Sequence, residues 1–211
     1  WISDKSRFAI DGLSRQRIDI PYIKQNGKLI STNWEKVLKK ITLEILKRGK
    51  ENTLALSGKF TDVETIFSAK SFLQSLESNY FDCRYDNVQF IENQRASYLF
   101  NSSIQEIDNA EAILLVGTNP RWEASVLNAR IRKAYINNNC KIGLIGKKID
   151  ATYEYTHLSD SIDHINDLLN NKSPFTKELE NSKKSLIIIG NSAINYNDGK
   201  EVLNICSEIA K

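Results

Sequence analysis

Four short apolar runs recur along the chain, and each is followed by a glycine. Apolar and polar residues do not alternate within a run, which is typical of a strand buried on both faces of a sheet. Helical patterns separate the runs, so the sequence predicts four strand–turn–helix units that build a three-layer α/β domain with a parallel sheet. The runs cover residues 53–57, 112–116, 141–145 and 185–189, and the glycines are Gly58, Gly117, Gly146 and Gly190.

The helical patterns place apolar residues three or four positions apart. The clearest predicted helix covers about residues 33–48, begins at a capping box of Thr32 and Glu35, and ends at Gly49. We expect its apolar side chains to be buried, namely Trp34, Val37, Leu38, Ile41 and Ile45. Further helices are predicted at about 62–76, 124–135, 162–169 and 198–210, and one more with Pro174 at its first position.

The remaining segments are less regular. Residues 1–20 show no convincing period and predict an irregular lead-in, whereas Asn26-Gly27 between 21–24 and 28–31 predicts a β-hairpin. Residues 80–83 are a candidate short strand, and 84–104 and 147–161 are predicted to be irregular. We therefore divide the chain into 1–32, a lead-in and hairpin that dock on neighbouring domains, and 33–211, the α/β domain.

Composition supports a globular protein. The 211 residues are 41% hydrophobic and 26% charged, and no apolar run approaches the roughly 20 residues of a membrane helix. We therefore expect no direct membrane insertion. Because the sequence contains no methionine, residue 1 is not a translation start, and we expect the chain to be processed or part of something longer.

Positive charge is concentrated near the start of the chain. Residues 1–50 hold twelve Lys and Arg against five Asp and Glu, whereas the remainder holds seventeen against twenty-one. A basic segment can bind nucleic acid, but here acidic residues are scattered among the cations and no aromatic residues are interleaved to stack bases. We therefore expect no nucleic-acid partner and predict that 1–50 docks on an acidic neighbour, with 84–104 as a second docking surface. The isolated chain should then expose apolar patches.

No metal or catalytic site is predicted. Cys83, Cys140 and Cys206 stand far apart and cannot build a local zinc or iron–sulfur site, so free thiols are expected, with Cys140 and Cys206 in the core. His157 and His164 are interpreted as hydrogen-bonded structural residues. The chain also lacks a dinucleotide-binding glycine motif, a phosphate-binding loop, a nucleophile elbow and a zinc-protease motif.

The turn after residues 112–116 is the one candidate binding site. Gly117, Thr118, Asn119, Pro120 and Arg121 lead directly from the strand into a helical pattern. A helix that begins there points free N–H groups at whatever lies above the strand end, which favours phosphates. Most such turns in α/β domains are empty, so the residues alone leave open a nucleotide-like cleft without a ligand.

Several blocks resemble the family of largest peripheral-arm subunits of respiratory complex I, the NADH:ubiquinone oxidoreductase. The match extends in order along essentially the whole chain, and its central block, G-T-N-P-R followed by E-A and N-A-R-I-R, is the most specific. The wider family is the molybdopterin oxidoreductases, whose G-x-N-P turn contacts the pterin dinucleotide and is matched here by Gly117, Asn119 and Pro120. The blocks are ISDKSRFAIDGLSRQRI (2–18), NGKLISTNWEKVL (26–38), RASYLFNSSI (95–104), AILLVGTNPRWEASVLNARIRKAY (112–135), TYEYTHLSDS (152–161) and IIIGNSAINYNDG (187–199).

The resemblance implies a structural role without catalytic residues. In the family, iron–sulfur clusters occupy Cys-rich domains N-terminal to the part matched here, and this portion of complex I carries no molybdenum cofactor. The chain would brace the cluster-bearing domains that pass electrons from NADH towards quinone. Its partners would be those domains and other peripheral-arm subunits, at the matrix face of the mitochondrial inner membrane or the cytoplasmic face of a bacterial membrane. A split gene or a partly ordered subunit would explain the missing clusters.

Two other interpretations remain open from the sequence. One is a fragment of a true molybdopterin enzyme, and the other is a small nucleotide-binding module, which rests on fold analogy alone. If the chain is a scaffold, the turn Gly117–Arg121 is vestigial and binds no cofactor. We expect Arg121 to pair with a carboxylate or backbone carbonyls, and Trp122 to fill the space that a cofactor ring would need.

Overall fold

A computed structural model describes residues 2–15, 17–58, 60–83 and 86–211. Contacts divide the chain into two compact units, which we call unit 1 (Trp1–Asp4 with Asp86–Lys211) and unit 2 (Lys5–Tyr85). The division predicted between residues 32 and 33 stays a prediction. Within the described residues, no helix combines the length and the apolar character needed to cross a bilayer.

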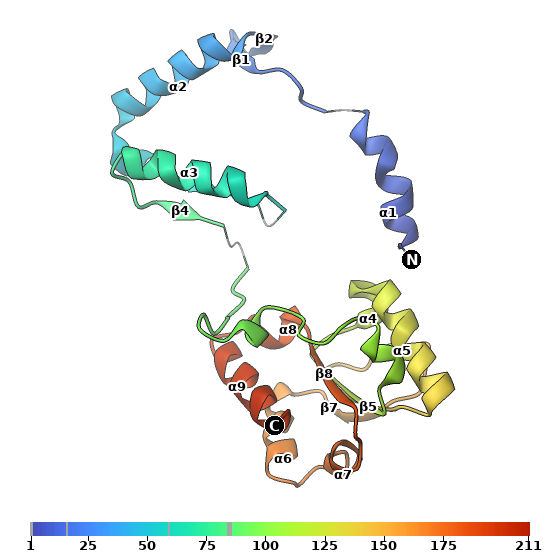
Figure 1. Cartoon of the computed structure of the whole chain (residues 1–211). Coiled ribbons are helices and arrows are strands. Elements are labelled where there is room, and N and C mark those ends of the chain that lie inside the picture. Colours follow the sequence, from blue (N-terminus) through green and yellow to red (C-terminus); the bar gives the residue numbers. More distant parts are fainter. Residues whose placement is uncertain (1, 16, 59, 84–85) are drawn as a thin grey trace. The chain divides into compact units, whose positions relative to one another are not determined.

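Unit 1 is built on a four-stranded parallel sheet with the strand order β7-β6-β5-β8 (Figure 1). The strands are β5 (Ala112–Val116), β6 (Lys141–Ile145), β7 (Thr156–Ser159) and β8 (Ser185–Ile189). All five residues of β5 are buried, because it lies between β6 and β8 and is covered on both faces. The predicted parallel α/β fold is therefore confirmed. The apolar runs 112–116, 141–145 and 185–189 form β5, β6 and β8 with the predicted bounds.

Successive side chains of β5 enter two separate cores, as expected for a strand inside a three-layer domain. Leu115 packs on one face with Ile131 of α5 (Ser125–Asn138). Leu114 packs on the other face with Ile165 and Leu203, from α6 (Ile165–Leu169) and α9 (Gly199–Ile209). Figure 1 shows α5 on one side of the sheet and α6 with α9 on the other.

Several elements of unit 1 depart from the prediction. Strand β7 lies inside the segment 147–161 that was expected to be irregular, because a half-exposed edge strand of sequence THLS carries no apolar run. The helix expected to begin at Pro174 is α7 (Thr176–Glu180). The remaining elements are η3 (Arg95–Ser97), η4 (Glu106–Asn109), α4 (Pro120–Glu123), η5 (Ile162–His164) and α8 (Asn191–Ile194).

Unit 2 contains short strands and two longer helices. Its elements are α1 (Asp4–Phe8, which begins at the last residue of the first segment of unit 1), η1 (Ala9–Leu13), β1 (Tyr22–Gln25), β2 (Lys28–Ser31), α2 (Trp34–Arg48), η2 (Lys50–Asn52), β3 (Ala55–Leu56), α3 (Val63–Ser75) and β4 (Phe81–Asp82). The hairpin β1–β2 is confirmed, and Asn26 and Gly27 both have the positive φ that its tight turn requires. The short strand expected at 80–83 is confirmed as β4.

Three predictions about the elements of unit 2 and their bounds are wrong. The irregular lead-in is helical over residues 4–13, where DKSRFAIDGL has no clear apolar period. The cap of α2 is Asn33, whose side chain accepts the Lys36 N–H at 3.0 Å, in place of Thr32. The strand expected at 53–57 is only Ala55–Leu56, and it pairs with β4 in a separate parallel sheet and not with β5.

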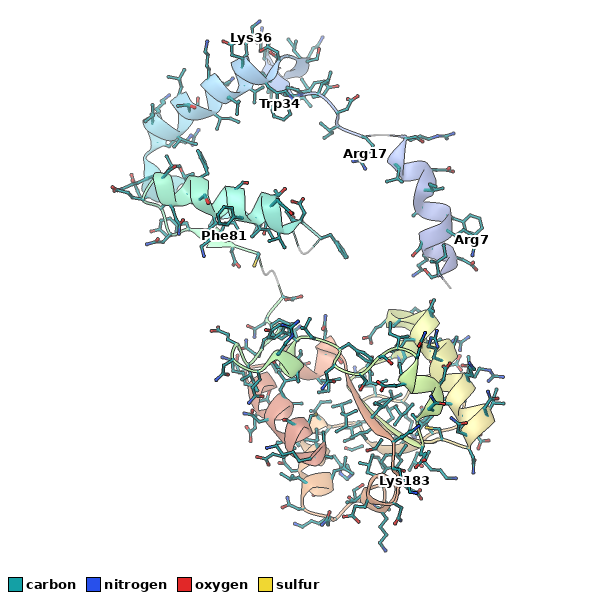
Figure 2. The ribbon with its side chains drawn as sticks, in the orientation of Figure 1. Arg7, Arg17, Trp34, Lys36, Phe81 and Lys183 are labelled. Atoms are coloured by element: carbon teal, nitrogen blue, oxygen red, sulfur yellow. The ribbon has the colours of Figure 1, made fainter. Side chains whose placement is uncertain are left out.

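The apolar faces of unit 2 are exposed, contrary to the expectation for residues 33–48. Helix α2 has no buried residue, and α3 buries only Leu73. Trp34 is 64% exposed and projects from the start of α2 (Figure 2), and Phe67 of α3 is 70% exposed. The apolar pattern therefore predicts the helices correctly, but unit 2 itself does not bury their apolar side chains. The exposure of apolar patches by the isolated chain stays a prediction.

Candidate functional site

The candidate site is the carboxyl edge of the sheet in unit 1, where the strands end in glycine turns. The Gly117 N–H donates to the Ile145 carbonyl at 2.8 Å, and the Gly190 N–H donates to the Val116 carbonyl at 2.9 Å. The hydrogen-bond ladders of β5 therefore continue for one residue into the turns. This pairing fixes the position at which the segment Gly117–Arg121 leaves the sheet.

Glycine is required where two of these turns touch. A Cβ on Gly190 would lie 2.3 Å from the Gly117 carbonyl oxygen and 2.9 Å from the Thr118 Cα. Gly117 itself has φ +56°, and a Cβ there would lie 2.7 Å from the Ala193 Cβ. The Ser192 hydroxyl also donates to the Gly117 carbonyl. The turn after β5 is therefore held from behind by the turn after β8.

The polar groups at the front of the turn are bound by a carboxylate from the same chain. Glu123, the last residue of α4, accepts the Asn119 N–H at 2.7 Å and the Thr118 hydroxyl at 3.1 Å. A glutamate that reaches back to the N–H of the N-cap residue forms one half of a capping box, here one position later than usual. We did not predict this role for Glu123, although an acidic residue in the first turn of a helix was the available signal.

Arg121 bonds in the opposite direction, to the segment that links β6 and β7. Its Nη1 lies 2.5 Å from the Asp150 Oδ2 and 3.1 Å from the Asp150 carbonyl oxygen. The predicted pairing of Arg121 with a carboxylate and a backbone carbonyl is therefore confirmed. The two side chains are 43% and 84% exposed, so the pair contributes at most about 1 kcal/mol to stability.

Residues 147–155, which we call the strap, are held at several further points. Asn128 donates to the Thr152 hydroxyl at 3.2 Å, and Arg132 donates to the Thr152 carbonyl. Within the strap, the Tyr155 hydroxyl accepts the Ile149 N–H at 3.0 Å and lies 2.8 Å from the Ile149 carbonyl. The strap is therefore fixed against α4 and α5 without regular secondary structure.

Trp122 does not fill the site. Its side chain is 80% exposed, so within unit 1 the expectation that it occupies the space of a cofactor ring is wrong. The bonds of its neighbours Arg121 and Glu123 explain the difference, because they direct those two side chains towards the protein and leave Trp122 facing outward. The expectation that Gly117, Thr118, Asn119, Pro120 and Arg121 bind no cofactor stays a prediction.

Titratable groups near this edge do not form a catalytic cluster in the described residues. The His157 Nε2 lies 2.9 Å from the Gly146 carbonyl oxygen, and His164 lies 2.9 Å from the Asp167 carboxylate, so both histidines have structural partners. Across the described ranges, no three His, Cys, Asp or Glu side chains are grouped as metal ligands. The N–H and O–H donors at this edge already bind a negative charge, that of the Glu123 carboxylate.

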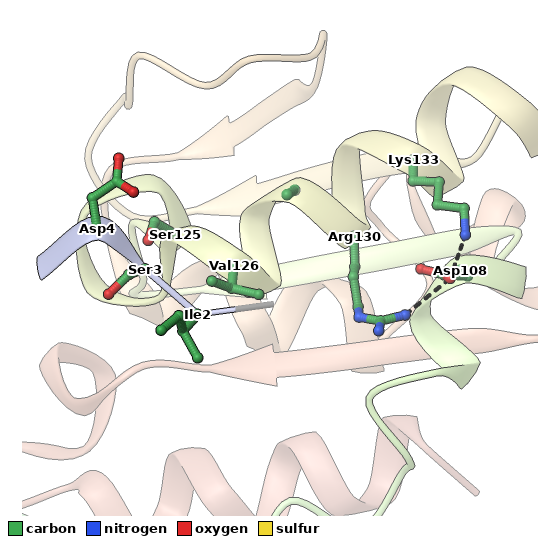
Figure 3. A pocket seen from close by; sticks show the side chains of 9 residues that line it. Ile2, Ser3, Asp4, Asp108, Ser125, Val126, Arg130 and Lys133 are labelled. Carbon is green, nitrogen blue, oxygen red and sulfur yellow. Dashed lines mark hydrogen bonds and ion pairs between the residues drawn. The ribbon is translucent and has the colours of Figure 1, made fainter. Parts of the chain in front are cut away.

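A second hollow of unit 1, of about 430 Å³, lies between residues 2–4 and α5 (Figure 3). At one end Asp108 accepts Arg130 at 2.9 Å and Lys133 at 2.7 Å. The Lys133 ammonium, together with Arg130, holds the pKa of the Asp108 carboxyl below its usual value, although desolvation opposes this effect. Both cations are therefore already neutralised in part. The rest of the lining is mixed: Ile2 and Val126 are apolar, whereas Asp4 adds a carboxylate and Ser3 and Ser125 add hydroxyls.

The second predicted docking surface, residues 84–104, is mostly irregular, with residues 84 and 85 outside the described ones. Phe90 and Tyr98 meet edge to face with their ring centroids 6.3 Å apart. Tyr98 and Phe100 are about half exposed. The segment therefore presents aromatic surface to solvent, and its docking role stays a prediction.

The three cysteines are free thiols, as predicted, and Cys140 and Cys206 lie in the two cores of unit 1. Burial raises the pKa of Cys140 to about 11 and that of Cys206 to about 12. Cys83 is exposed. Because the thiolate is the reactive form, the two buried thiols are expected to be inert near neutral pH.

Thiol labelling at about pH 8 should therefore modify Cys83 quickly and leave Cys140 and Cys206 unmodified until the chain unfolds. Mass spectrometry of the labelled chain, native and in denaturant, distinguishes the three positions. A Cys83→Ser variant is the control and should take up no label in the native state. Rapid native labelling of Cys140 or Cys206 would contradict their placement in the core.

Comparison with known proteins gives one family. The model of the molybdopterin oxidoreductase family matches residues 17–211. The chain is also similar to three bacterial proteins that are each named as the G subunit of NADH-quinone oxidoreductase. It is 36% identical to the one from Rickettsia bellii (strain RML369-C) and 37% identical to those from Rickettsia felis (strain ATCC VR-1525 / URRWXCal2) and Rickettsia conorii (strain ATCC VR-613 / Malish 7). Each match covers 209 residues, which is 99% of this chain but only 31% of the relative.

Proposed function

The chain belongs to the molybdopterin oxidoreductase family, and on this basis we propose that it is a structural portion of the large peripheral-arm subunit of NADH:quinone oxidoreductase, respiratory complex I. The observation that carries the proposal is the similarity to NADH-quinone oxidoreductase subunits along 99% of the chain. The chain spans about a third of the length of those relatives, so the electron-transfer activity belongs to a larger assembly. In that assembly this portion braces the iron–sulfur domains and supplies no catalytic residue or cofactor of its own.

The exposed apolar surface of unit 2 supports a role inside an assembly. Trp34, Leu38 and Phe67 are each more than half exposed, on two helices that bury almost nothing. A monomeric protein rarely keeps such a large apolar surface in contact with water. We therefore propose that the cluster-bearing part of the subunit and other peripheral-arm subunits cover it. The complex would lie at the matrix face of the mitochondrial inner membrane or, as the bacterial relatives favour, at the cytoplasmic face of a bacterial membrane.

Purification from the native cell tests the assignment. The chain, tagged at its C-terminus, should migrate in a native gel with NADH:quinone oxidoreductase activity, and its companions should include iron–sulfur subunits. An unrelated soluble protein carrying the same tag is the control. A chain that migrates alone would contradict the scaffold role. A chain that carries stoichiometric molybdenum and a pterin would contradict it too, and would favour a molybdopterin enzyme.

Replacement of Trp34 by alanine should reduce the assembled fraction of the chain. Large aromatic residues dominate interface energies, and truncation of a central one costs about 2–4 kcal/mol of binding. Because Trp34 is 64% exposed, the same change should shift the stability of the isolated chain by less than about 1 kcal/mol. Native-gel quantification compares Trp34→Ala with Lys36→Ala, an exposed polar position on the same helix. Equal assembly of both variants would contradict α2 as an interface.

A further inference from the structure

Donors that an external anion would use are present at the turn after β5, but they already have an acceptor. Proline supplies no N–H at position 120, so the Asn119 N–H and the Thr118 hydroxyl are the donors at the front of the turn. Both bond to the Glu123 carboxylate, at 2.7 Å and 3.1 Å. The Trp122 and Glu123 N–H groups are also bonded, since both donate to the Asn119 carbonyl.

The neighbouring cation is occupied as well. Arg121 is the positively charged side chain within the turn, and its Nη1 contacts both the carboxylate and the carbonyl of Asp150. The two residues that flank Trp122 therefore bond in opposite directions: Glu123 bonds back to the turn, and Arg121 bonds to Asp150 of the strap. A phosphate at this strand end would have to displace both contacts.

We infer that Glu123 is a built-in anion that takes the place of a phosphate-bearing ligand at this turn and so excludes one. A phosphate bonded to the same two donors would lie in contact with the Glu123 carboxylate, and like charges at that separation repel each other. The carboxylate also occupies these two donors, so an external anion would gain a hydrogen bond from them only by displacing Glu123. This inference rests on the proposed scaffold role. It identifies Glu123 as the residue that prevents the turn Gly117–Arg121 from binding a phosphate-bearing cofactor such as a pterin dinucleotide.

Two variants separate the charge of Glu123 from its hydrogen bonds. Glu123→Gln keeps an acceptor oxygen within reach of the Asn119 N–H and loses the negative charge. Glu123→Ala loses both and leaves the donors free. Glu154→Ala is the matched control, because Glu154 is an exposed acidic residue of the strap that makes no hydrogen bond or ion pair within the described residues.

Residue-resolved hydrogen exchange of the full chain, with inorganic phosphate as the probe, tests the inference. The Asn119 amide should exchange about 10–100-fold faster in Glu123→Ala, the loss expected for one charge-assisted hydrogen bond, and remain slow in Glu123→Gln and Glu154→Ala. On the order of 10 mM phosphate should slow that exchange at least roughly twofold in Glu123→Ala, and leave wild type and Glu154→Ala unchanged.

Two results would overturn the inference. One is a phosphate-dependent change at Asn119 in the wild-type chain, which would show that an anion can displace Glu123. The other is exchange at Asn119 that is unaltered in Glu123→Ala, or that phosphate does not slow in that variant. Neither result depends on the presence of complex I, whereas failure to migrate with the oxidoreductase contradicts the proposed function alone. The two failures are therefore distinguishable.

Discussion

Replacement of Gly117 by valine should lower the free energy of unfolding of unit 1 by about 2–6 kcal/mol, through backbone strain and overpacking together. Gly117 has φ +56°, a conformation that a β-branched residue adopts only at high cost. Its Cβ would also lie 2.7 Å from the Ala193 Cβ and 2.8 Å from the Ala193 nitrogen. Urea denaturation followed by circular dichroism measures the loss.

Gly12→Ala is the matched control for this change. A Cβ at Gly12 would meet no atom within 4 Å, and its φ lies outside the positive range. We expect Gly12→Ala to remain within about 0.5 kcal/mol of wild type. A Gly117→Val chain as stable as the control would show that the turns after β5 and β8 do not approach each other as described.

Truncation of Leu114 to alanine should have a comparable effect, at about 2–5 kcal/mol. Leu114 is fully buried on the central strand of unit 1, where it packs with Ile165 and Leu203. The cavity would lie between rigid elements on both sides, so the surroundings could not collapse to fill it. Thermal unfolding should show a lower melting temperature with the native circular dichroism spectrum retained at low temperature.

Leu29→Ala provides the comparison, because Leu29 is 70% exposed on β2. The same chemical change there should cost less than about 1 kcal/mol. Equal destabilisation by the two substitutions would contradict the placement of the core around β5. Loss of assembly without loss of stability in Leu29→Ala would extend the docking surface of unit 2 to the hairpin.

The strands with continuous apolar sequences were predictable. Strands β5, β6 and β8 have the bounds of the predicted apolar runs. Strand β5 is apolar and buried at every position, and β6 and β8 are apolar after an exposed polar first residue, as expected for strands of a sheet that is covered on both faces. Strand β7 was not predictable, since its sequence THLS contains one apolar residue and therefore no apolar run. The segment 53–57 shows the reverse error, because an apolar run indicates a strand but not the sheet that the strand joins.

The helices of unit 2 show the limit of apolar periodicity. Helix α2 forms where the spacing of Trp34, Leu38 and Ile41 predicts it. The same spacing cannot tell whether the surface that buries these side chains is part of this chain or of another one. Their exposure within unit 2 therefore depends on the surfaces that surround α2, and the spacing of apolar residues along one helix carries no information about those surfaces.

The candidate site was predicted in position but not in detail. The turn Gly117–Arg121 follows directly from a buried strand that ends in glycine and proline, and the bond of Arg121 to a carboxylate was expected. The return of Glu123 to the turn was missed because Glu123 lies one position later than the usual capping-box residue. The helix also ends after one turn at Ala124, whose φ is −148°, although the helical pattern continues in sequence. The direction of Trp122 could not be predicted, because it follows from the bonds of its neighbours Arg121 and Glu123.

During synthesis on a ribosome, β5 and β6 emerge well before β8, although β5 needs β8 to cover its second edge. Until residues 185–189 leave the exit tunnel, the most apolar strand of the nascent chain keeps one row of N–H and C=O groups unpaired. Such an edge is a template for aggregation, and parallel sheets with distant strands fold slowly. A message truncated before the codon for Ser185 would therefore yield a product for chaperones and proteases, not a smaller folded protein.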